Sequence, residues 1–78
     1  MKKRDKILLF YLIRDRVNDI LDSVEESEEP GVIQSYLEIV RYVQLAETLH
    51  LDINELIDPE EYLSIKKYLL LKGYVIDD

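Results

Sequence analysis

The sequence predicts an all-α fold, a small bundle or irregular array of four helices, from three observations. Apolar residues recur at helical spacing through two long segments. Two aspartate-led signals have the form of helix amino-terminal caps. All prolines and glycines, two of each, fall at the ends of the predicted helices. The 78 residues are expected to form one small domain, 1–78.

The first helix is predicted over residues 3–25. One face of it carries apolar residues at i, i+4, i+7, i+8 and i+11, namely Ile13, Val17, Ile20, Leu21 and Val24. An extended strand also fits the run 7–13, but the helical period continues through Val24. Leu8, Tyr11 and Leu12 point away from this face, so the first half is apolar nearly all round. We therefore expect two sides to be covered, one of them by a second copy of the chain.

The segment EESEEPG, residues 25–31, is the clearest break in the chain. Its glutamates repel one another, Pro30 cannot continue a helix, and Gly31 is conformationally free. The second helix is predicted over residues 31–50, with acidic residues favourably placed at its amino end. Its apolar stripe consists of Val32, Tyr36, Ile39, Val43 and Ala46.

A very short third helix is predicted over residues 53–57. Asp52 and Glu55 have the spacing of a capping box, in which the aspartate accepts from a backbone N–H and the glutamate reaches back to the cap. Leu51 and Leu56 have the spacing of the accompanying hydrophobic staple. Because another capping signal begins six residues later, this helix has room for about one turn.

The fourth helix is predicted over residues 59–72. Asp58 is its cap, Pro59 takes the first helical position, and Glu61 completes a second capping box. Gly73 is expected to end the helix as a left-handed C-cap. The remaining residues, YVIDD, are predicted to be a short tail.

Residues 45–58, LAETLHLDINELID, resemble the closing segment of repressor-type helix-turn-helix domains of the Cro/XRE kind. In that family a helix ends in Leu-Ala-x-x-Leu, a tight turn follows, and a last short helix carries Glu-Leu. The resemblance implies a DNA-binding domain whose reading helix lies upstream. Here His50 replaces the usual glycine of the turn, and Arg41 is the only cation of the upstream segment PGVIQSYLEIVRYVQ. A reading helix needs several donors to phosphates and base edges, so we interpret the shared letters as a shared packing solution.

Residues 52–78 resemble the second and third helices of a winged helix, in which a glycine after the reading helix begins the wing. This resemblance implies a helix-turn-helix-like transcriptional regulator, which is our alternative hypothesis. We expect no wing hairpin, because two residues follow Ile76, and Glu60 and Glu61 would meet phosphate unfavourably. An ordinary solvated helix face also explains the lysines. The implied DNA contacts are Ser64, Lys66, Lys67 and Lys72.

The charge is strongly negative and unevenly distributed. The formal net charge is −7 at pH 7, and residues 17–63 carry thirteen acidic side chains against Arg41 alone, whereas residues 1–16 have a net charge of +4. A negative protein binds nucleic acid and anionic membrane poorly. We interpret the acidic surface either as a solvated face or as a nucleic-acid mimic that blocks a DNA-binding protein. Its candidate residues are Asp19, Asp22, Glu25, Glu26, Glu28 and Glu29.

The amino-terminal segment MKKRDKILLFYLIRDR has the basic start and apolar run of a targeting signal. That run covers only residues 7–13, is closed by Arg14, and lacks a small-residue cleavage site. A membrane span needs about 20 apolar residues. Since the chain also has no cysteine, we predict a cytoplasmic protein with no membrane partner.

No catalytic, metal or cofactor site is predicted. His50 is the only histidine, the chain has no cysteine, and no base is evident for its serines. The acidic run 25–29 lacks the spaced ligands and turn glycine of a calcium loop. Gly31 and Gly73, the only glycines, do not make a phosphate-binding loop. We therefore expect no enzyme activity.

Six tyrosines are many for a 78-residue chain to bury with every hydroxyl satisfied. Tyrosine is enriched where proteins meet, and tyrosines on the core rim with hydroxyls in water are the alternative. We predict a non-enzymatic regulator or inhibitor that docks to a partner protein and forms a homodimer through its first helix. Phage and plasmid accessory proteins offer an analogy. The candidate dimer or partner surface is Leu8, Tyr11, Leu12, Tyr36, Tyr42 and Tyr68.

Overall fold

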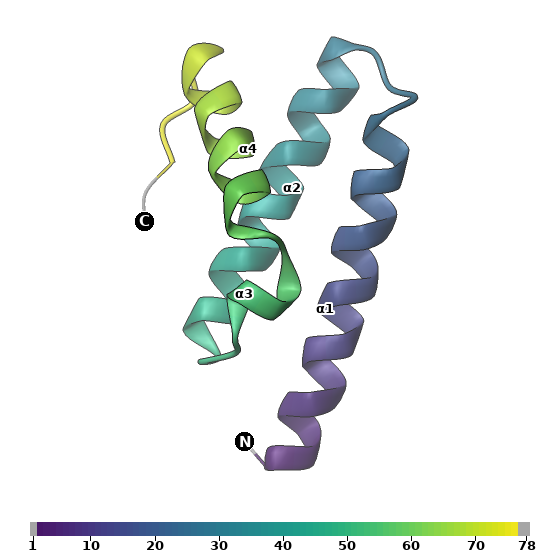
Figure 1. The fold of residues 1–78 in the computed structure, drawn as a ribbon, viewed down its shortest axis with the longest axis vertical. Helices are drawn as coiled ribbons and strands as arrows, with labels where there is room; N and C mark the ends of the chain where they lie inside the picture. The colour runs from purple at the N-terminus through teal and green to yellow at the C-terminus, as the bar shows by residue number, and fades with distance from the viewer. Residues whose placement is uncertain (1, 77–78) are drawn as a thin grey trace.

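The chain folds into four α-helices in the order that the sequence predicts (Figure 1). The computed structural model describes residues 2–76, so Met1, Asp77 and Asp78 of the predicted domain and tail lie outside it. Within the described residues there is no β-strand, and the all-α prediction is confirmed. The helices are α1 (Lys3–Val24), α2 (Glu29–Thr48), α3 (Ile53–Leu56) and α4 (Pro59–Leu71).

The second helix, α2, is the centre of the molecule. α1 packs against one side of it and α4 against the other, while α3 contacts both α1 and α2. Figure 1 shows α1 and α4 on opposite sides of α2. The two outer helices therefore depend on α2 for most of their contacts, and each presents its other face to solvent.

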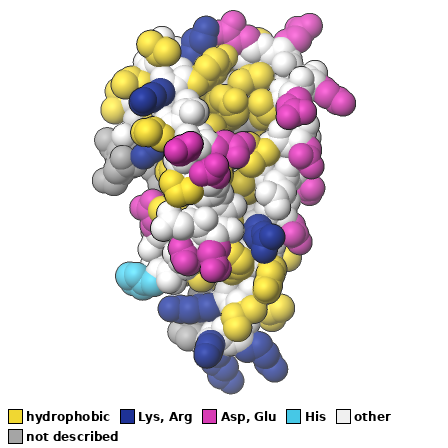
Figure 2. Space-filling view, in the orientation of Figure 1, with side chains coloured by type: hydrophobic (Ala, Val, Ile, Leu, Met, Phe, Trp, Pro, Cys, Tyr) yellow, Lys and Arg dark blue, Asp and Glu magenta, His cyan; other side chains and the backbone are white. Residues whose placement is uncertain are grey.

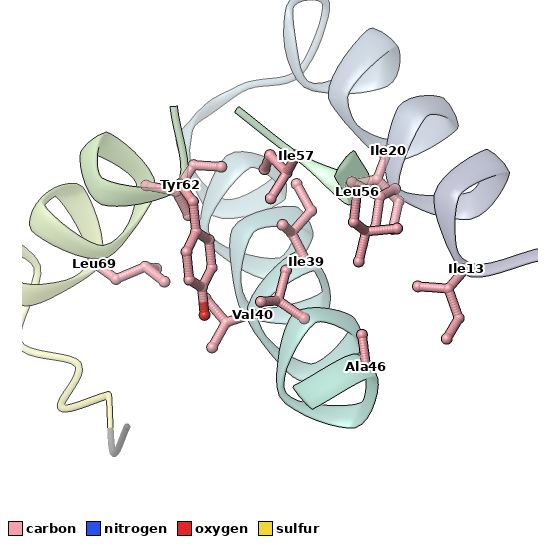
Figure 3. Close-up of a cluster of buried hydrophobic side chains, with 12 residues drawn as sticks. Ile13, Ile20, Ile39, Val40, Ala46, Leu56, Ile57, Tyr62 and Leu69 are labelled. Atoms are coloured by element: carbon pink, nitrogen blue, oxygen red, sulfur yellow. The ribbon is translucent and has the colours of Figure 1, made fainter. Parts of the chain in front are cut away.

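The hydrophobic core lies where α1, α3 and α4 meet α2 (Figure 3). It includes the predicted stripes, with Ile13, Val17 and Ile20 buried on α1. No polar or charged residue is buried among the described residues, so the core is held by apolar burial. The buried residues are Ile13, Val17, Ile20, Ile39, Val40, Val43, Ala46, Leu56, Ile57, Tyr62, Ile65 and Leu69.

The bounds of α2 differ from the predicted 31–50 by two residues at each end. The helix begins at Glu29 because Pro30 fits the first turn, where its missing N–H is not needed and its φ is already helical. It ends at Thr48 because the chain reverses through His50, whose φ is +59°. The other three helices begin where predicted and end one residue earlier.

The turn after α2 is a Schellman motif. The His50 N–H donates to the carbonyl of Glu47 (3.0 Å) and the Leu51 N–H donates to the carbonyl of Ala46 (2.9 Å). Both carbonyls would otherwise be left unsatisfied at the helix end. His50 thus forms the turn that follows α2, in a left-handed conformation that glycine adopts more readily.

The turn after α4 repeats this motif with a glycine. Gly73 has φ +92°, its N–H donates to the carbonyl of Leu70 (3.0 Å), and the Tyr74 N–H donates to the carbonyl of Leu69 (2.9 Å). The predicted left-handed C-cap at Gly73 is confirmed. After the turn, Ile76 packs against the core, so the tail folds back along α4.

Both predicted aspartate caps are present. In each, the donating N–H belongs to the second residue of the helix, whereas in a capping box it belongs to the third. Asp52 Oδ1 accepts from the Asn54 N–H (3.0 Å), and Asp58 Oδ1 accepts from the Glu60 N–H (3.1 Å). Each aspartate satisfies one of the free amides at a helix start. These caps fix the corner that brings Leu56 and Ile57 into the core.

The contrast between the two Schellman turns predicts that His50→Gly stabilises the protein. A non-glycine residue in the left-handed region costs about 1 kcal/mol. Glycine removes this cost, although its greater freedom in the unfolded state offsets part of the gain. We expect the free energy of unfolding in urea to rise by about 0.5–1 kcal/mol. The control is Glu47→Gly, inside α2, which should lower it by about 1 kcal/mol. A His50→Gly protein no more stable than the parent would contradict the assignment.

Adjacent leucines of α4 provide a second test. Leu69 is fully buried and Leu70 is 64% exposed. Leu69→Ala should reduce the free energy of unfolding by about 3 kcal/mol, because it leaves a cavity against α2. Leu70→Ala should change it by less than about 0.5 kcal/mol. Equal losses in a denaturant titration would mean that α4 packs in a different rotation.

Candidate protein interaction site

The most apolar part of α1 is the part that the fold covers least. Its first buried residue is Ile13, although the apolar run begins at Ile7. Leu8 and Leu12 are 56% and 66% exposed, and Ile7 and Tyr11 are also about half exposed to solvent. Figure 1 shows the first turns of α1 extending past the end of α2, where no other helix reaches them.

One face of α1 changes character along its length. Arg4, Leu8, Tyr11, Asp15 and Asp22 are spaced i, i+4, i+7, i+11 and i+18, so they form one line on the helix. All five are exposed. We call this line the outer stripe of α1; it lies opposite the buried residues Ile13, Val17 and Ile20. It is basic at its start, apolar in the middle and acidic beyond.

The surface of the molecule shows the same separation of charge. In Figure 2, acidic side chains run along the right-hand edge over the upper part of α1, Lys and Arg gather at the lower tip, and hydrophobic side chains lie between them. The residues of the predicted acidic surface are all exposed: Asp19, Asp22, Glu25, Glu26, Glu28 and Glu29. Of these residues, Asp19 and Asp22 lie on α1 with the apolar part of the outer stripe, and Glu29 begins α2.

One member of the acidic surface is engaged within the molecule. The Lys72 ammonium contacts the Glu29 carboxylate, which joins the end of α4 to the start of α2. This hydrogen bond, together with the negative charge of Glu29, raises the pKa of Lys72 above its ordinary value. A raised lysine pKa means that the pair stabilises the fold at neutral pH and that this contribution is lost as pH rises through that pKa.

Of the four tyrosines of the predicted docking surface, only Tyr11 is brought together with its leucines. Tyr36 of α2 and Tyr68 of α4 pack edge to face, with ring centroids 5.3 Å apart and planes at 90°. Tyr42 is half-buried against the core. Only Leu8, Tyr11 and Leu12 share an exposed face, on α1. Tyr36 and Tyr68 instead help to join α2 to α4.

A second exposed apolar surface, which the sequence reasoning missed, lies at the end of α4. Its most exposed members are Leu70, at 64%, and Leu71, at 85%. Leu63, Leu70 and Ile76 line a shallow groove with Lys66 and Lys67 at its edge. The available signal was the run of three leucines: only Leu69 continues the spacing of Tyr62 and Ile65, so the next two point outward. We call the exposed set the α4 ridge: Leu63, Leu70, Leu71 and Val75.

The residues of the DNA-binding alternative do not form a free basic surface. The Ser64 hydroxyl donates to the Glu60 carbonyl (3.1 Å), the Lys66 ammonium lies 4.7 Å from the centre of the Tyr62 ring, and Lys72 is paired as described. Lys67 is exposed. The first turn of the same helix carries exposed Glu60 and Glu61, which oppose phosphate.

The depressions in the described surface differ in their linings, and the one between α1, α3 and the start of α4 is largely polar. The depression between α2, α3 and α4 is lined mainly by apolar side chains, with Glu47 and Lys66 at its edge. Within residues 2–76, no three acidic or histidine side chains converge as metal ligands would. Of the helices described, none combines the length and hydrophobicity needed to cross a bilayer.

Comparisons with protein-family models, curated proteins and solved structures return no match to this chain. The function of this chain is therefore inferred from its own residues. Their geometry leaves two uncovered apolar surfaces, the outer stripe of α1 and the α4 ridge, in place of a pocket that holds reactive groups.

The assignment of Tyr36 and Tyr68 to the fold predicts energetic coupling between them. We expect a double-mutant cycle with Tyr36→Leu and Tyr68→Leu to give a coupling free energy of about 1 kcal/mol, the usual value for an edge-to-face aromatic pair. The pair Tyr11 and Tyr68 is the control, with expected coupling near zero. If Tyr36 and Tyr68 also proved uncoupled in denaturant titrations, both rings would be available for docking.

Proposed function

We propose that this chain is a non-enzymatic protein–protein interaction module, a cytoplasmic regulator or inhibitor that works by docking and forms a homodimer. The observation that carries the proposal is the pair of apolar surfaces, the outer stripe of α1 and the α4 ridge, that the fold leaves uncovered. Clustered exposed hydrophobic side chains on a small protein mark interaction sites. Two separate surfaces allow one contact with a second copy and another with a partner protein.

The α4 ridge is the proposed partner surface. Its groove is lined by Leu63, Leu70 and Ile76, and Lys66 and Lys67 border it. An apolar helix face inserted there would bury the leucines, and carboxylates at its edge would meet the lysines. We therefore expect a partner that presents apolar side chains flanked by acidic ones.

The test is a pull-down from lysate of the native host, with the tagged full chain as bait and with nuclease added. We expect a stoichiometric protein that survives nuclease. Leu70→Glu should reduce its recovery at least about tenfold, because a carboxylate in the apolar groove is costly to bury and competes with the partner's carboxylates for Lys66 and Lys67. Leu12→Glu, which places the same charge on the outer face of α1, is the matched control and should retain the partner. Both variants should keep the circular dichroism of the parent.

Two results would contradict the proposal. One is capture that neither variant weakens, since the α4 ridge would then play no part in it. The other is recovery of nucleic acid, with every protein lost on nuclease treatment, which would favour the DNA-binding alternative.

A specific arrangement of carboxylates favours a second candidate, mimicry of nucleic acid. Asp15, Asp19 and Asp22 are exposed at i, i+4 and i+7 on α1, so they set negative charges at regular intervals along one face, and exposed Glu26 lies in the turn that follows the helix. A DNA-binding protein blocked by this row should bind with an affinity that falls steeply with salt, as contacts between exposed charges do. Binding that is unchanged between 50 and 300 mM salt, roughly a halving of the screening length, would exclude mimicry.

A further inference from the structure

We propose that two copies of the chain pair antiparallel through the outer stripes of α1, in one defined register. In this register Leu8 of each copy faces Tyr11 of the other, and Arg4 faces Asp15. The inference rests on the homodimer of the proposed function and deepens it, because it names the surface, the direction and the contacts.

The outer stripe is self-complementary about a single point. In a two-fold symmetric antiparallel pair, facing residues lie at equal distances on either side of the symmetry point. The pair of Leu8 with Tyr11 and the pair of Arg4 with Asp15 both have their midpoint between residues 9 and 10. One register therefore satisfies the apolar contact and the ionic contact together, twice in each dimer.

Charge selects the antiparallel direction. A parallel pair would set Asp15 and Asp22 against their own copies, and Arg4 against Arg4. Like charges in contact across an interface are repulsive and exclude the wrong arrangement. The antiparallel pair instead brings the basic first turn of one α1 to the acidic middle of the other.

A second copy fits this face better than a membrane surface does. The basic first turn and the exposed Leu8 and Tyr11 would suit an anionic bilayer, but Asp15 and Asp22 share their stripe. Helices that lie on membranes carry cations around the apolar face. Ile7 and Leu12, half or more exposed, flank the stripe and widen the apolar contact between copies. The population of a homodimer depends on protein concentration, so concentration must be varied in any test.

The test uses reciprocal charge variants, measured by sedimentation equilibrium at low salt. Arg4→Glu and Asp15→Arg each create two like-charge contacts in their homodimer, and each should weaken dimerisation about tenfold. Mixing the two variants should restore dimers to within about threefold of the parent, because the heterodimer contains two opposite-charge pairs. The double variant of one chain should also dimerise like the parent. These exposed positions are outside the core, so helicity should be unchanged.

Other variants separate this inference from the proposed function. Leu12→Glu should be a folded monomer that still captures the partner through the α4 ridge. A folded Leu12→Glu protein that keeps the dimeric mass of the parent would overturn the α1 interface. If Leu70→Glu nevertheless lost the partner protein, the proposed docking function would still stand. Single variants that dimerise as tightly as the parent would refute the register. A mixture of Arg4→Glu and Asp15→Arg in which dimers are not restored would also refute it. If the parent protein were monomeric and co-sedimented with phosphatidylserine vesicles, the outer stripe would bind a membrane and not a second copy.

Discussion

The packing of both long outer helices on α2 is the constraint on which the rest of the structure depends. Because α1 and α4 take opposite sides of α2, neither shields the outer face of the other. A domain of this size buries only about 60% of its unfolded surface, and among the described residues no other helix covers those faces. The exposed Leu8 and Leu12 on α1 and Leu70 on α4 are consequences of this three-helix arrangement. Both candidate interaction surfaces follow from it.

Most of the fold could be predicted because its signals are local. The Asp52 and Asp58 caps, the Gly73 turn and the stripe of Ile13, Val17 and Ile20 each depend on residues within a few positions of one another. The predicted start of α2 at residue 31 is two residues late, because the acidic and glycine residues around Pro30 indicate a break even though the proline itself suits a first helical turn. The site was harder, since exposure depends on which helices are neighbours. The sequence predicted Leu8, Tyr11 and Leu12 correctly as uncovered by their own chain, but it did not show that Tyr36 and Tyr68 pack against each other.

The uneven charge of the sequence corresponds to an ordered arrangement of basic, apolar and acidic residues along α1. Arg4, from the basic amino-terminal segment, and the carboxylates Asp15 and Asp22 lie at the two ends of one exposed stripe, with Leu8 and Tyr11 between them. A solvated face does not require this order, whereas an antiparallel contact between copies does. The same contact would leave Glu26 and the α4 ridge outward, available to a partner protein. Dimerisation and docking are thus assigned to different faces of one small fold.

The distance between spin labels at position 22 in the dimer, measured by double electron–electron resonance on Asp22→Cys, tests the α1 interface most directly. The chain has no cysteine of its own, so labelling is specific. With the symmetry point between residues 9 and 10 and a rise of about 1.5 Å per residue, the two labels should be roughly 40 Å apart. Moving the label to Asn18→Cys, within the same helix and four residues nearer the symmetry point, should shorten the distance by about 12 Å, because the labels of both copies move toward each other. Two equal distances below about 20 Å would indicate a parallel pair, and the absence of a dipolar signal at concentrations where the protein is dimeric would place the interface elsewhere; either result would contradict the account.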